Sequence, residues 1–362
     1  MRSTRSVDRF IRCSSLTDLA EVLPVSRKEN LKGSERRVCR ASVLEADELL
    51  DDFYVSILDW SVAGPLAVGL GSKVCLRGDT NEVLCDLDND TVASVKWTAT
   101  GRHLAVGTRK GRLIVYDVET KKVVFQDSLH SKRRIGCLSW NNDLLASGGR
   151  DKNIQVRDVR ENKKSFVVGR HRQEVCGIEW SPCGEFLLSG GNDNLVKVWS
   201  LSSKKPMRIY SDHVAAVKAI GWSPHRRRIF ASGGGTADRT IKIYDTSQEQ
   251  PLVSQDTGSQ VCALKWAATA NEIVSTHGYS QNHVCIWQVG QTLTSQAVLT
   301  GHTSRVLFLA LSPDGSTVAT ASGGDHSLRF WRNCFPPKTT TALFTNKKHQ
   351  RLLPGLGGNL LR

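Results

Sequence analysis

Several features that assign proteins to familiar classes are missing from this chain of 362 residues. No apolar run approaches the roughly 20 residues that a membrane-spanning helix needs, so we expect no membrane association. The amino-terminal stretch MRSTRSVDRFIRC has no continuous apolar core, and we expect no secretory signal there. Hydrophobic residues make up 40% of the chain, which is enough to build a large core in one domain or two.

The ten cysteines also lack the spacing of a metal site or of a disulfide framework. None forms a Cys-x-x-Cys pair, and none has a histidine partner at the spacing of a zinc site. Six of them lie inside strand-like runs: Cys75, Cys85, Cys137, Cys176, Cys262 and Cys285. This placement favours small core residues of a reduced, intracellular protein, and we expect no metal and no other cofactor.

Acidic residues are absent from Arg332 to the end of the chain, where six Lys or Arg occur. The first forty residues hold ten basic and five acidic residues, so the two ends contribute +5 and +6 to the net charge of +14. Basic ends are typical of solvated arms that meet acidic partners. A nucleic-acid surface would more usually lie on the folded body, so we expect no direct nucleic-acid binding. The charge leaves an RNA- or chromatin-associated scaffold as an alternative.

Seven similar stretches follow one another along the chain. Each has an apolar run that ends on a shared marker position: Trp60, Trp97, Trp140, Trp180, Trp222, Trp266 and Leu311. Successive markers are 37 to 45 residues apart, and each copy contains three short runs in which apolar and polar residues alternate. Alternation indicates strands with one buried face. A period of about 40–45 residues that ends on Trp-Asp or a related pair is typical of WD40 blades.

The repeats predict an all-β protein, a seven-bladed WD40 propeller with four strands in each blade around a central channel. We place the propeller at residues 41–332, between a short, flexible, basic amino-terminal arm at 1–40 and a basic carboxy-terminal tail at 333–362. The stretch RVCRASVLEA precedes the first copy and has no partner of its own. Because an open strand edge invites aggregation, we expect this stretch to close the last blade onto the first.

Aspartate and histidine recur at fixed places in four of the repeats. The aspartates fall in the turn between the second and third strands, and the histidines fall in the loop before the first strand: Asp151, Asp193, Asp238 and Asp325, with His130, His171, His213 and His302. An aspartate in such a turn accepts hydrogen bonds from the turn backbone and from the histidine, so we interpret both as structural. No Ser-His-Asp spacing, phosphate loop or carboxylate pair stands out from the repeats. We therefore expect no enzyme activity.

Some polar residues exceed what a blade needs. In a propeller they would line one mouth of the channel, and four successive blades supply them: Asn192, Asn194, Thr236, Gln260 and Arg305. A ring of amide, hydroxyl and guanidinium groups suits a short polar peptide better than an apolar ligand. Polar rims are also ordinary on propellers, so spacing alone leaves both interpretations open.

The stretches LLDDFYVSILDWS, HRQEVCGIEWSP, GGNDN, GGGTADR, DTGSQVC, STHGYSQN and GHTSRV resemble the Fizzy and Fizzy-related proteins, from about Leu44 to Trp331. GGGTADR and VGTRKG are closer to the Fizzy-related branch. These proteins are WD40 co-activators of the anaphase-promoting complex, a ubiquitin ligase. The resemblance implies an adaptor in the nucleus and cytoplasm that brings degron-containing substrates, such as cyclins, to the ligase. It implies ligase subunits and checkpoint or pseudosubstrate inhibitors as further partners.

The resemblance also implies roles for single residues. In the family, the KEN degron lies across the top of the propeller, on contacts that match Asn192, Asn194, Thr236, Gln260 and Arg305. Arg305 would take the glutamate of the degron. The family's destruction-box groove lies between the first and last blades and uses an acidic pair. Asp52 matches one acid, and His326, in a turn with one extra residue, replaces the other.

The family binds the ligase through motifs at both ends. In DRFIR, the matching residues are Asp8, Arg9, Phe10 and Ile11, and Arg12 replaces a proline. The chain ends on Leu361 and Arg362, where the family has Ile-Arg. The arm also contains a KEN triplet, made by Lys28, Glu29 and Asn30, for which chance and self-recognition both stay open. Arg12 and His326 motivate the alternative of a divergent member that acts as a decoy or a specialised receptor.

Overall fold

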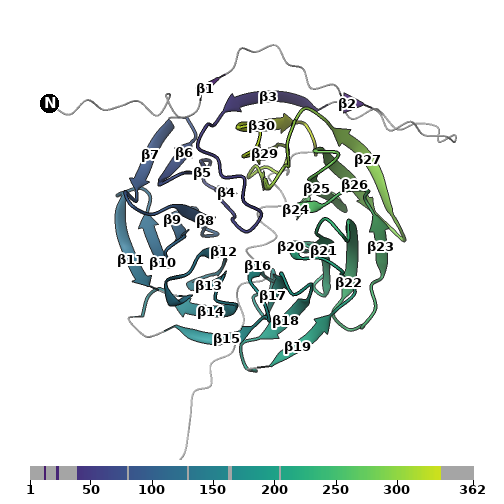
Figure 1. The fold of residues 1–362 in the computed structure, drawn as a ribbon, viewed down its shortest axis with the longest axis horizontal. Helices are drawn as coiled ribbons and strands as arrows, with labels where there is room; N and C mark the ends of the chain where they lie inside the picture. Colours follow the sequence, from purple (N-terminus) through teal and green to yellow (C-terminus); the bar gives the residue numbers. More distant parts are fainter. Residues whose placement is uncertain are drawn as a thin grey trace, which may run out of the picture.

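The computed structural model describes residues 12–13, 22–23, 39–79, 81–128, 130–161, 165–203 and 205–335. Its strands form seven antiparallel sheets, which are arranged as the blades of a closed ring (Figure 1). The predicted all-β, seven-bladed propeller is therefore confirmed.

Six blades consist mainly of strands that follow one another along the chain. Blade 1 contains β4 (Leu58–Trp60), β5 (Leu66–Leu70), β6 (Lys73–Arg77) and β7 (Asn81–Asp86). Blade 2 contains β8 (Val92–Trp97), β9 (His103–Thr108), β10 (Arg112–Asp117) and β11 (Lys122–Ser128). A short 3-10 turn, η2 (His130–Lys132), precedes blade 3, which contains β12 (Ile135–Asn141), β13 (Leu144–Gly149), β14 (Asn153–Asp158) and β15 (Phe166–Arg170).

The next three blades repeat this pattern. Blade 4 contains β16 (Val175–Trp180), β17 (Phe186–Gly191), β18 (Val196–Ser200) and β19 (Pro206–Tyr210). Blade 5 contains β20 (Val217–Trp222), β21 (Ile229–Gly234), β22 (Thr240–Asp245) and β23 (Val253–Asp256). Blade 6 contains β24 (Val261–Trp266), β25 (Glu272–His277), β26 (Val284–Val289) and β27 (Leu293–Leu299), and β2 (Val22–Leu23) pairs with β27.

Blade 7 is completed by a strand from the other end of the chain. It contains β28 (Phe308–Leu311), β29 (Val318–Ser322) and β30 (Ser327–Arg332), and its fourth strand is β3 (Arg40–Glu45). β3 pairs antiparallel with β30 over its whole length, and β1 (Arg12–Cys13) pairs with β3. The predicted closing strand in RVCRASVLEA is therefore confirmed, and it removes the open edge that the ring would otherwise have.

Burial along the strands differs from the predicted alternation. The first three strands of most blades are buried almost continuously, as in β5 and β21, where every residue is buried. Only outer strands such as β11, β19 and β23 alternate between more and less exposed residues. The reason is that neighbouring blades cover both faces of the inner strands, as happens in sheets that are packed on both sides.

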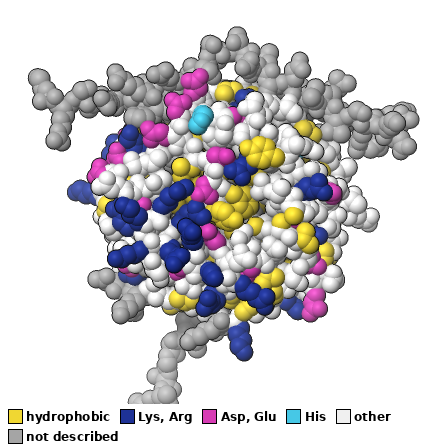
Figure 2. Space-filling view, viewed as in Figure 1, with side chains coloured by type: hydrophobic (Ala, Val, Ile, Leu, Met, Phe, Trp, Pro, Cys, Tyr) yellow, Lys and Arg dark blue, Asp and Glu magenta, His cyan; other side chains and the backbone are white. Residues whose placement is uncertain are grey.

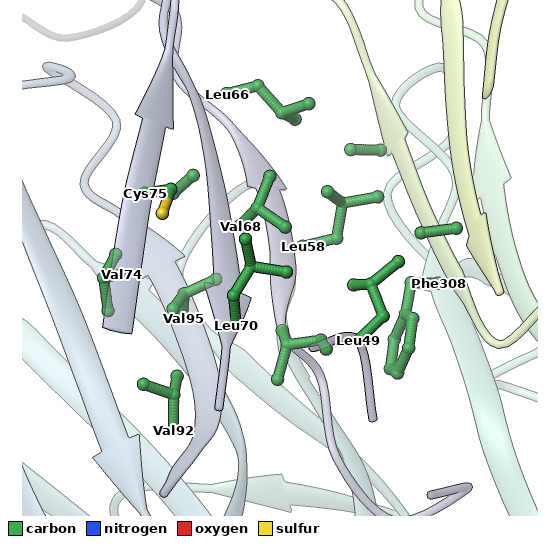
Figure 3. Packing of buried hydrophobic residues seen from close by; sticks show 14 of the residues in the cluster. Leu49, Leu58, Leu66, Val68, Leu70, Val74, Cys75, Val92, Val95 and Phe308 are labelled. Atoms are coloured by element: carbon green, nitrogen blue, oxygen red, sulfur yellow. The ribbon is translucent and has the colours of Figure 1, made fainter. Parts of the chain in front are cut away.

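The blades approach one another closely. A Cβ atom at Gly190 would collide with the backbone oxygen of Val217 in the next blade, which explains one glycine of the GGNDN turn. Near the closure, buried residues of blades 7, 1 and 2 form one core, and Figure 3 shows Leu49, from the segment before blade 1, beside Phe308 of β28. Closing the ring thus adds core contacts as well as strand pairing.

The central channel and its rim are set by strand direction. The first strands of the blades line a cavity of about 350 Å³ at the centre of the ring. Because the strands in a blade are antiparallel, the turn between its second and third strands lies at the same end as the start of its first strand. We call this end of the propeller the rim face.

Candidate functional site

Histidine–aspartate pairs hold the rim turns of four blades. In blade 4, Nδ1 of His171 lies 2.8 Å from Oδ1 of Asp193, and Nε2 lies 2.7 Å from Oγ of Ser189. The indole of Trp199 donates to the same hydroxyl at 2.8 Å. The equivalent pairs are His130–Asp151, His213–Asp238 and His302–Asp325. All four predicted pairs are present, and each ties a rim turn to the loop before its blade.

The partners of Asp193 show that it shapes the bend. Besides His171, its carboxylate accepts the backbone N–H groups of Arg172 at 2.7 Å and Leu195 at 3.4 Å. Burial alone would raise the pKa of Asp193, but the hydrogen bonds from His171 and from the backbone outweigh it and lower the pKa. These contacts confirm the structural interpretation of the aspartate.

The residue after each of these aspartates has a left-handed backbone. The φ angles are 74° at Lys152, 64° at Asn194, 60° at Arg239 and 52° at His326. Asparagine and histidine tolerate this conformation better than most residues. Asn194 therefore has a backbone role in addition to any contact with a ligand. His326 occupies the equivalent position of blade 7, in a turn with the same pattern.

Asn192 is fixed from two sides. The hydroxyl of Tyr54 donates to its Oδ1 at 3.0 Å, and its amide nitrogen donates to Oε1 of Gln173 at 2.5 Å. Burial, assisted by nearby acidic groups, raises the pKa of Tyr54, so the hydroxyl keeps its proton and donates. Tyr54 belongs to the segment before blade 1, which therefore reaches across the channel mouth to blade 4.

Thr236 and Gln260 continue the rim over blades 5 and 6. Thr236 is exposed in the turn between β21 and β22. Gln260 directly precedes β24 and is buried against Gly278, where a Cβ atom would lie 2.6 Å from its Oε1. Together with Asn192, Asn194 and Arg305, they occupy the rim face of four successive blades, as predicted. Their ligand stays a prediction.

Arg305 already has an acidic partner. Its guanidinium lies 2.9 Å from Oδ1 of Asp51 and also donates to the backbone oxygen of Asp51 at 3.2 Å. The same guanidinium lies over the ring of Tyr279, 5.7 Å from its centroid. A ligand carboxylate at Arg305 would therefore have to share or replace Asp51.

The next residue, Asp52, faces the opposite side of the channel mouth. Its Oδ2 accepts hydrogen bonds from Arg109 of blade 2 at 3.0 Å and from Arg134 of blade 3 at 2.6 Å. Arg134 in turn donates to the carboxylate of Glu174 at 2.8 and 3.0 Å. Two guanidinium groups thus hold Asp52 over blades 2 and 3, so a degron arginine at Asp52 would have to share its carboxylate with Arg109 and Arg134.

A different acid lies beside His326. The register of β3 and β30 places Glu45 opposite Ser327, and the backbone N–H of Ala46 donates to the backbone oxygen of His326 at 2.7 Å. Glu45 and His326 are both exposed. Glu45 is therefore a further acid near the turn of His326, and the destruction-box roles of Asp52 and His326 stay predictions.

Sequence reasoning also missed Tyr54, Asp51 and Glu45 as rim residues. One signal was available in LEADELLDDFY, which runs from the end of the closing strand towards the first repeat. A segment that leaves the outer edge of blade 7 and enters blade 1 at the channel has to cross the rim. Its acids therefore had to lie over the last blade and the channel mouth.

Some predicted residues lie outside the described part of the chain: Asp8, Arg9, Phe10, Ile11, Lys28, Glu29, Asn30, Leu361 and Arg362. Within the described part, no group of three or more His, Cys, Asp or Glu side chains is placed to hold a metal ion. None of the nine cysteines whose side chains the structure describes forms a disulfide. No helix among the described residues is long and apolar enough to span a membrane.

The family model and the similar sequences indicate the same protein family. Residues 44–331 match the family model of the CDC20/Fizzy WD40 domain. The chain is 49% identical over 313 residues to the B-type cell cycle switch protein ccs52A of Medicago truncatula, which covers 84% of this chain and 65% of the relative. It is 44% identical over 300 residues to the APC/C activator protein CDH1 of Saccharomyces cerevisiae, covering 82% and 52%. The chain thus spans about half to two thirds of these relatives.

Solved structures agree with the fold. A chain in a crystal structure of the mitotic checkpoint complex is 37% identical, with a TM-score of 0.79, covering 85% of this chain and all of that one. A structure of U3-55K has a TM-score of 0.68 at 14% identity, covering 81% and 98%. The second likeness concerns the propeller fold alone.

Proposed function

Because the chain belongs to the CDC20/Fizzy family of WD40 proteins, we propose that it is a non-catalytic substrate-recognition adaptor and co-activator of the anaphase-promoting complex ubiquitin ligase. Relatives named as an activator or a subunit of that complex support this: CDH1 of Saccharomyces cerevisiae, and the anaphase-promoting complex subunit cdh1 of Dictyostelium discoideum, 42% identical over 368 residues. The observation that carries the proposal is the polar ring on the rim face of blades 4 to 7.

That ring is suited to a KEN degron. Asn192 and Asn194 offer amides that can pair with an extended peptide and with the asparagine of the degron. Arg305 offers a guanidinium for its glutamate, in exchange with Asp51. On the blades in between, Thr236 supplies a hydroxyl and Gln260 supplies an amide. Because Tyr54 and Gln173 already hold Asn192, little side-chain entropy is lost when a peptide binds.

A destruction-box degron would use the junction of blades 7 and 1. Its arginine needs an acidic partner. Two exposed acids lie next to the turn of His326: Asp51, which pairs with Arg305, and Glu45. One carboxylate in an exposed position supplies on the order of 1 kcal/mol. We therefore propose that KEN recognition is the stronger of the two degron activities.

The two ends of the chain are proposed to bind the ligase. Asp8 to Ile11 form the amino-terminal motif, and Leu361 with Arg362 form the carboxy-terminal one. Two weak contacts on one chain bind a common large partner with avidity. We further propose checkpoint or pseudosubstrate inhibitors as competitors for the rim, and a location in the nucleus and cytoplasm. The KEN triplet of the arm, Lys28, Glu29 and Asn30, would compete for the rim of its own chain or act as a degron of this protein.

A reconstituted reaction tests the proposal. The intact chain is added to ligase that lacks a co-activator, with a KEN substrate or the same substrate with alanines in place of KEN. We expect ubiquitination of the KEN substrate alone, and loss of ligase recovery when residues 1–38 and 336–362 are removed. KEN binding without ligase recovery by the intact chain would favour the decoy alternative, which Arg12 and His326 motivate. Neither binding nor recovery would refute the adaptor function.

A further inference from the structure

A strongly basic cavity lies on the rim face outside the polar ring. It has a volume of about 170 Å³ and is lined by five residues, all of them cationic: Arg109, Lys132, Arg133, Arg134 and Arg150. Figure 2 shows Lys and Arg side chains gathered on this side of the face, over the region where Figure 1 places β8 to β14. At about 30 Å³ for each water, the cavity admits a small anionic group.

The repeat relates this cavity to the polar ring. Arg109 and Arg150 directly follow the second strands of blades 2 and 3, which is the position that Asn192 holds in blade 4. Arg134 directly precedes the first strand of blade 3, as Gln260 does in blade 6. Equivalent positions of the repeat therefore carry amides in the polar ring of blades 4 and 6, and guanidinium groups in the cavity of blades 2 and 3.

One extra residue adds further charge. Blade 4 begins at Val175, four residues after His171. Blade 3 begins at Ile135, five residues after the equivalent His130. The chain accommodates the additional residue by left-handed backbone at three consecutive positions, with φ angles of 55°, 51° and 57° for His130, Ser131 and Lys132. Such backbone is uncommon for residues other than glycine and tends to occur at functional positions. Here it places Lys132 and Arg133 at the cavity.

The charges in the cavity are only partly balanced. Asp52 and Glu174 are both engaged by Arg134, and Asp52 also by Arg109. In the part of the chain that the structure describes, no carboxylate forms an ion pair with the exposed side chains of Lys132, Arg133 or Arg150. Five cations thus face two carboxylates, and three positive charges remain for a ligand.

The cavity adjoins the polar ring through one side chain. The guanidinium of Arg134 lies over the ring of Tyr54, 5.2 Å from its centroid, and the hydroxyl of Tyr54 bonds to Asn192. A peptide that lies on Asn192 therefore has the cavity directly beside its path. We propose that this cavity binds the phosphoryl group of a phosphoserine or phosphothreonine that flanks the degron of a substrate. The inference rests on the adaptor function proposed above and adds a preference for phosphorylated substrates.

A phosphopeptide suits the site better than a nucleic acid does. A phosphoryl group brings a charge of about −2 and three acceptor oxygens to one point, which matches guanidinium donors converging on one small cavity. A nucleic-acid strand needs a continuous basic path. Here the carboxylates of Asp52 and Glu174 border the cavity on the channel side, where a following phosphate would be repelled.

Calorimetry with matched peptides tests the inference on the full chain. A KEN peptide is compared with versions that carry one phosphoserine at successive positions on either side of the triplet, and with a phosphoserine peptide in which alanines replace KEN. The variant Lys132→Gln/Arg133→Gln removes two exposed cationic side chains from the cavity. The control Arg226→Gln/Arg227→Gln removes two exposed cationic side chains from the turn between β20 and β21, at the opposite end of blade 5.

We expect phosphorylation at one side of the triplet to tighten binding about tenfold. The phosphoryl group forms charge-assisted hydrogen bonds with the cavity that the unmodified serine cannot form. The gain should persist in the control variant, shrink at high salt and disappear in Lys132→Gln/Arg133→Gln. If the unmodified KEN peptide binds and no phosphoserine improves it, the inference is overturned while the adaptor function stands. If no KEN peptide binds, the adaptor function fails. The phosphoserine peptide without KEN then decides whether the cavity binds phosphate.

A short single-stranded RNA is titrated in the same way. Weak RNA binding that both double variants reduce equally supports the assignment to a phosphopeptide. RNA binding that is tighter than phosphopeptide binding and is lost only in Lys132→Gln/Arg133→Gln overturns it.

Discussion

The hydroxyl of Tyr54 donates a 3.0 Å hydrogen bond to Oδ1 of Asn192, a residue 138 positions further along the chain. This bond joins the segment before blade 1 to the rim of blade 4. It leaves the amide of Asn192 oriented by Tyr54 on one side and by Gln173 on the other. The rim is therefore arranged before any peptide binds.

Tyr54→Phe should weaken KEN-peptide binding about two- to tenfold, because it removes one hydrogen bond that orients Asn192. Titration calorimetry measures the change, and the melting temperature should stay nearly constant. Tyr210→Phe is the control, since it removes a hydroxyl that bonds to Asp245 and Gln248, away from the rim. Equal affinity of the Tyr54→Phe protein and the unaltered chain would show that the orientation of Asn192 is irrelevant to the peptide.

Asp51→Asn should strengthen KEN-peptide binding about two- to fivefold at low salt. Asp51 competes with the degron glutamate for Arg305, and a half-exposed ion pair of this kind contributes up to about 1 kcal/mol. Asp47→Asn removes another exposed acid of the same segment and serves as the control. Weaker binding by Asp51→Asn would contradict the competition and would make Asp51 itself a peptide contact.

Glu45→Gln should weaken a destruction-box peptide about fivefold, since Glu45 is the acid beside His326. Asp52→Asn should leave this peptide unaffected, because Arg109 and Arg134 hold Asp52 over other blades. Fluorescence anisotropy with a labelled peptide distinguishes the two. The assignment fails if Asp52→Asn abolishes binding and Glu45→Gln does not.

The stacked imidazoles of His277 and His283 should make the propeller sensitive to acid. Their ring centroids are 4.5 Å apart, and burial lowers the pKa of His277 to about 3 and that of His283 to about 4, from 6.5. Because both folded pKa values are depressed, the unfolded chain binds more protons below pH 6.5, and stability falls with pH from there down to the folded pKa values. Each ring should cost about 2 kcal/mol of unfolding free energy between pH 7 and pH 5.

Urea unfolding at a series of pH values checks this. His283→Gln should flatten the dependence between pH 7 and pH 5, because it removes one of the two protonation sites. A slope that is the same in His283→Gln and in the unaltered chain would refute the role of the pair.

The ring itself was predictable because each blade repeats the same local signals. In blade 4, His171 precedes the first strand, Trp180 ends that strand and Asp193 fixes the turn after the second strand. Because the same signals recur in other blades, each copy supports the assignment of the others. The closing strand was predictable for a related reason, since a ring of seven sheets cannot leave an edge of β30 unpaired.

The electrostatics of the rim could not be predicted in the same way. Asp51 and Asp52 are neighbours in the chain, yet one pairs with Arg305 of blade 7 and the other with Arg109 and Arg134 of blades 2 and 3. Their segment lies outside the repeats, so no period indicates which way each side chain turns. The basic cavity was missed because its residues are spread over three loops and depend on one additional residue after His130.

The most direct test of the central claim is calorimetry of a KEN peptide and of its alanine-substituted counterpart on the full chain and on Arg305→Ala. Rim substitutions usually change stability little, so the variant should remain folded. We predict that the KEN peptide binds the unaltered chain, that the alanine peptide does not, and that Arg305→Ala weakens KEN binding about tenfold or more. Equal binding of the two peptides, or unaltered KEN affinity in a folded Arg305→Ala protein, would contradict the claim that this rim recognises the degron.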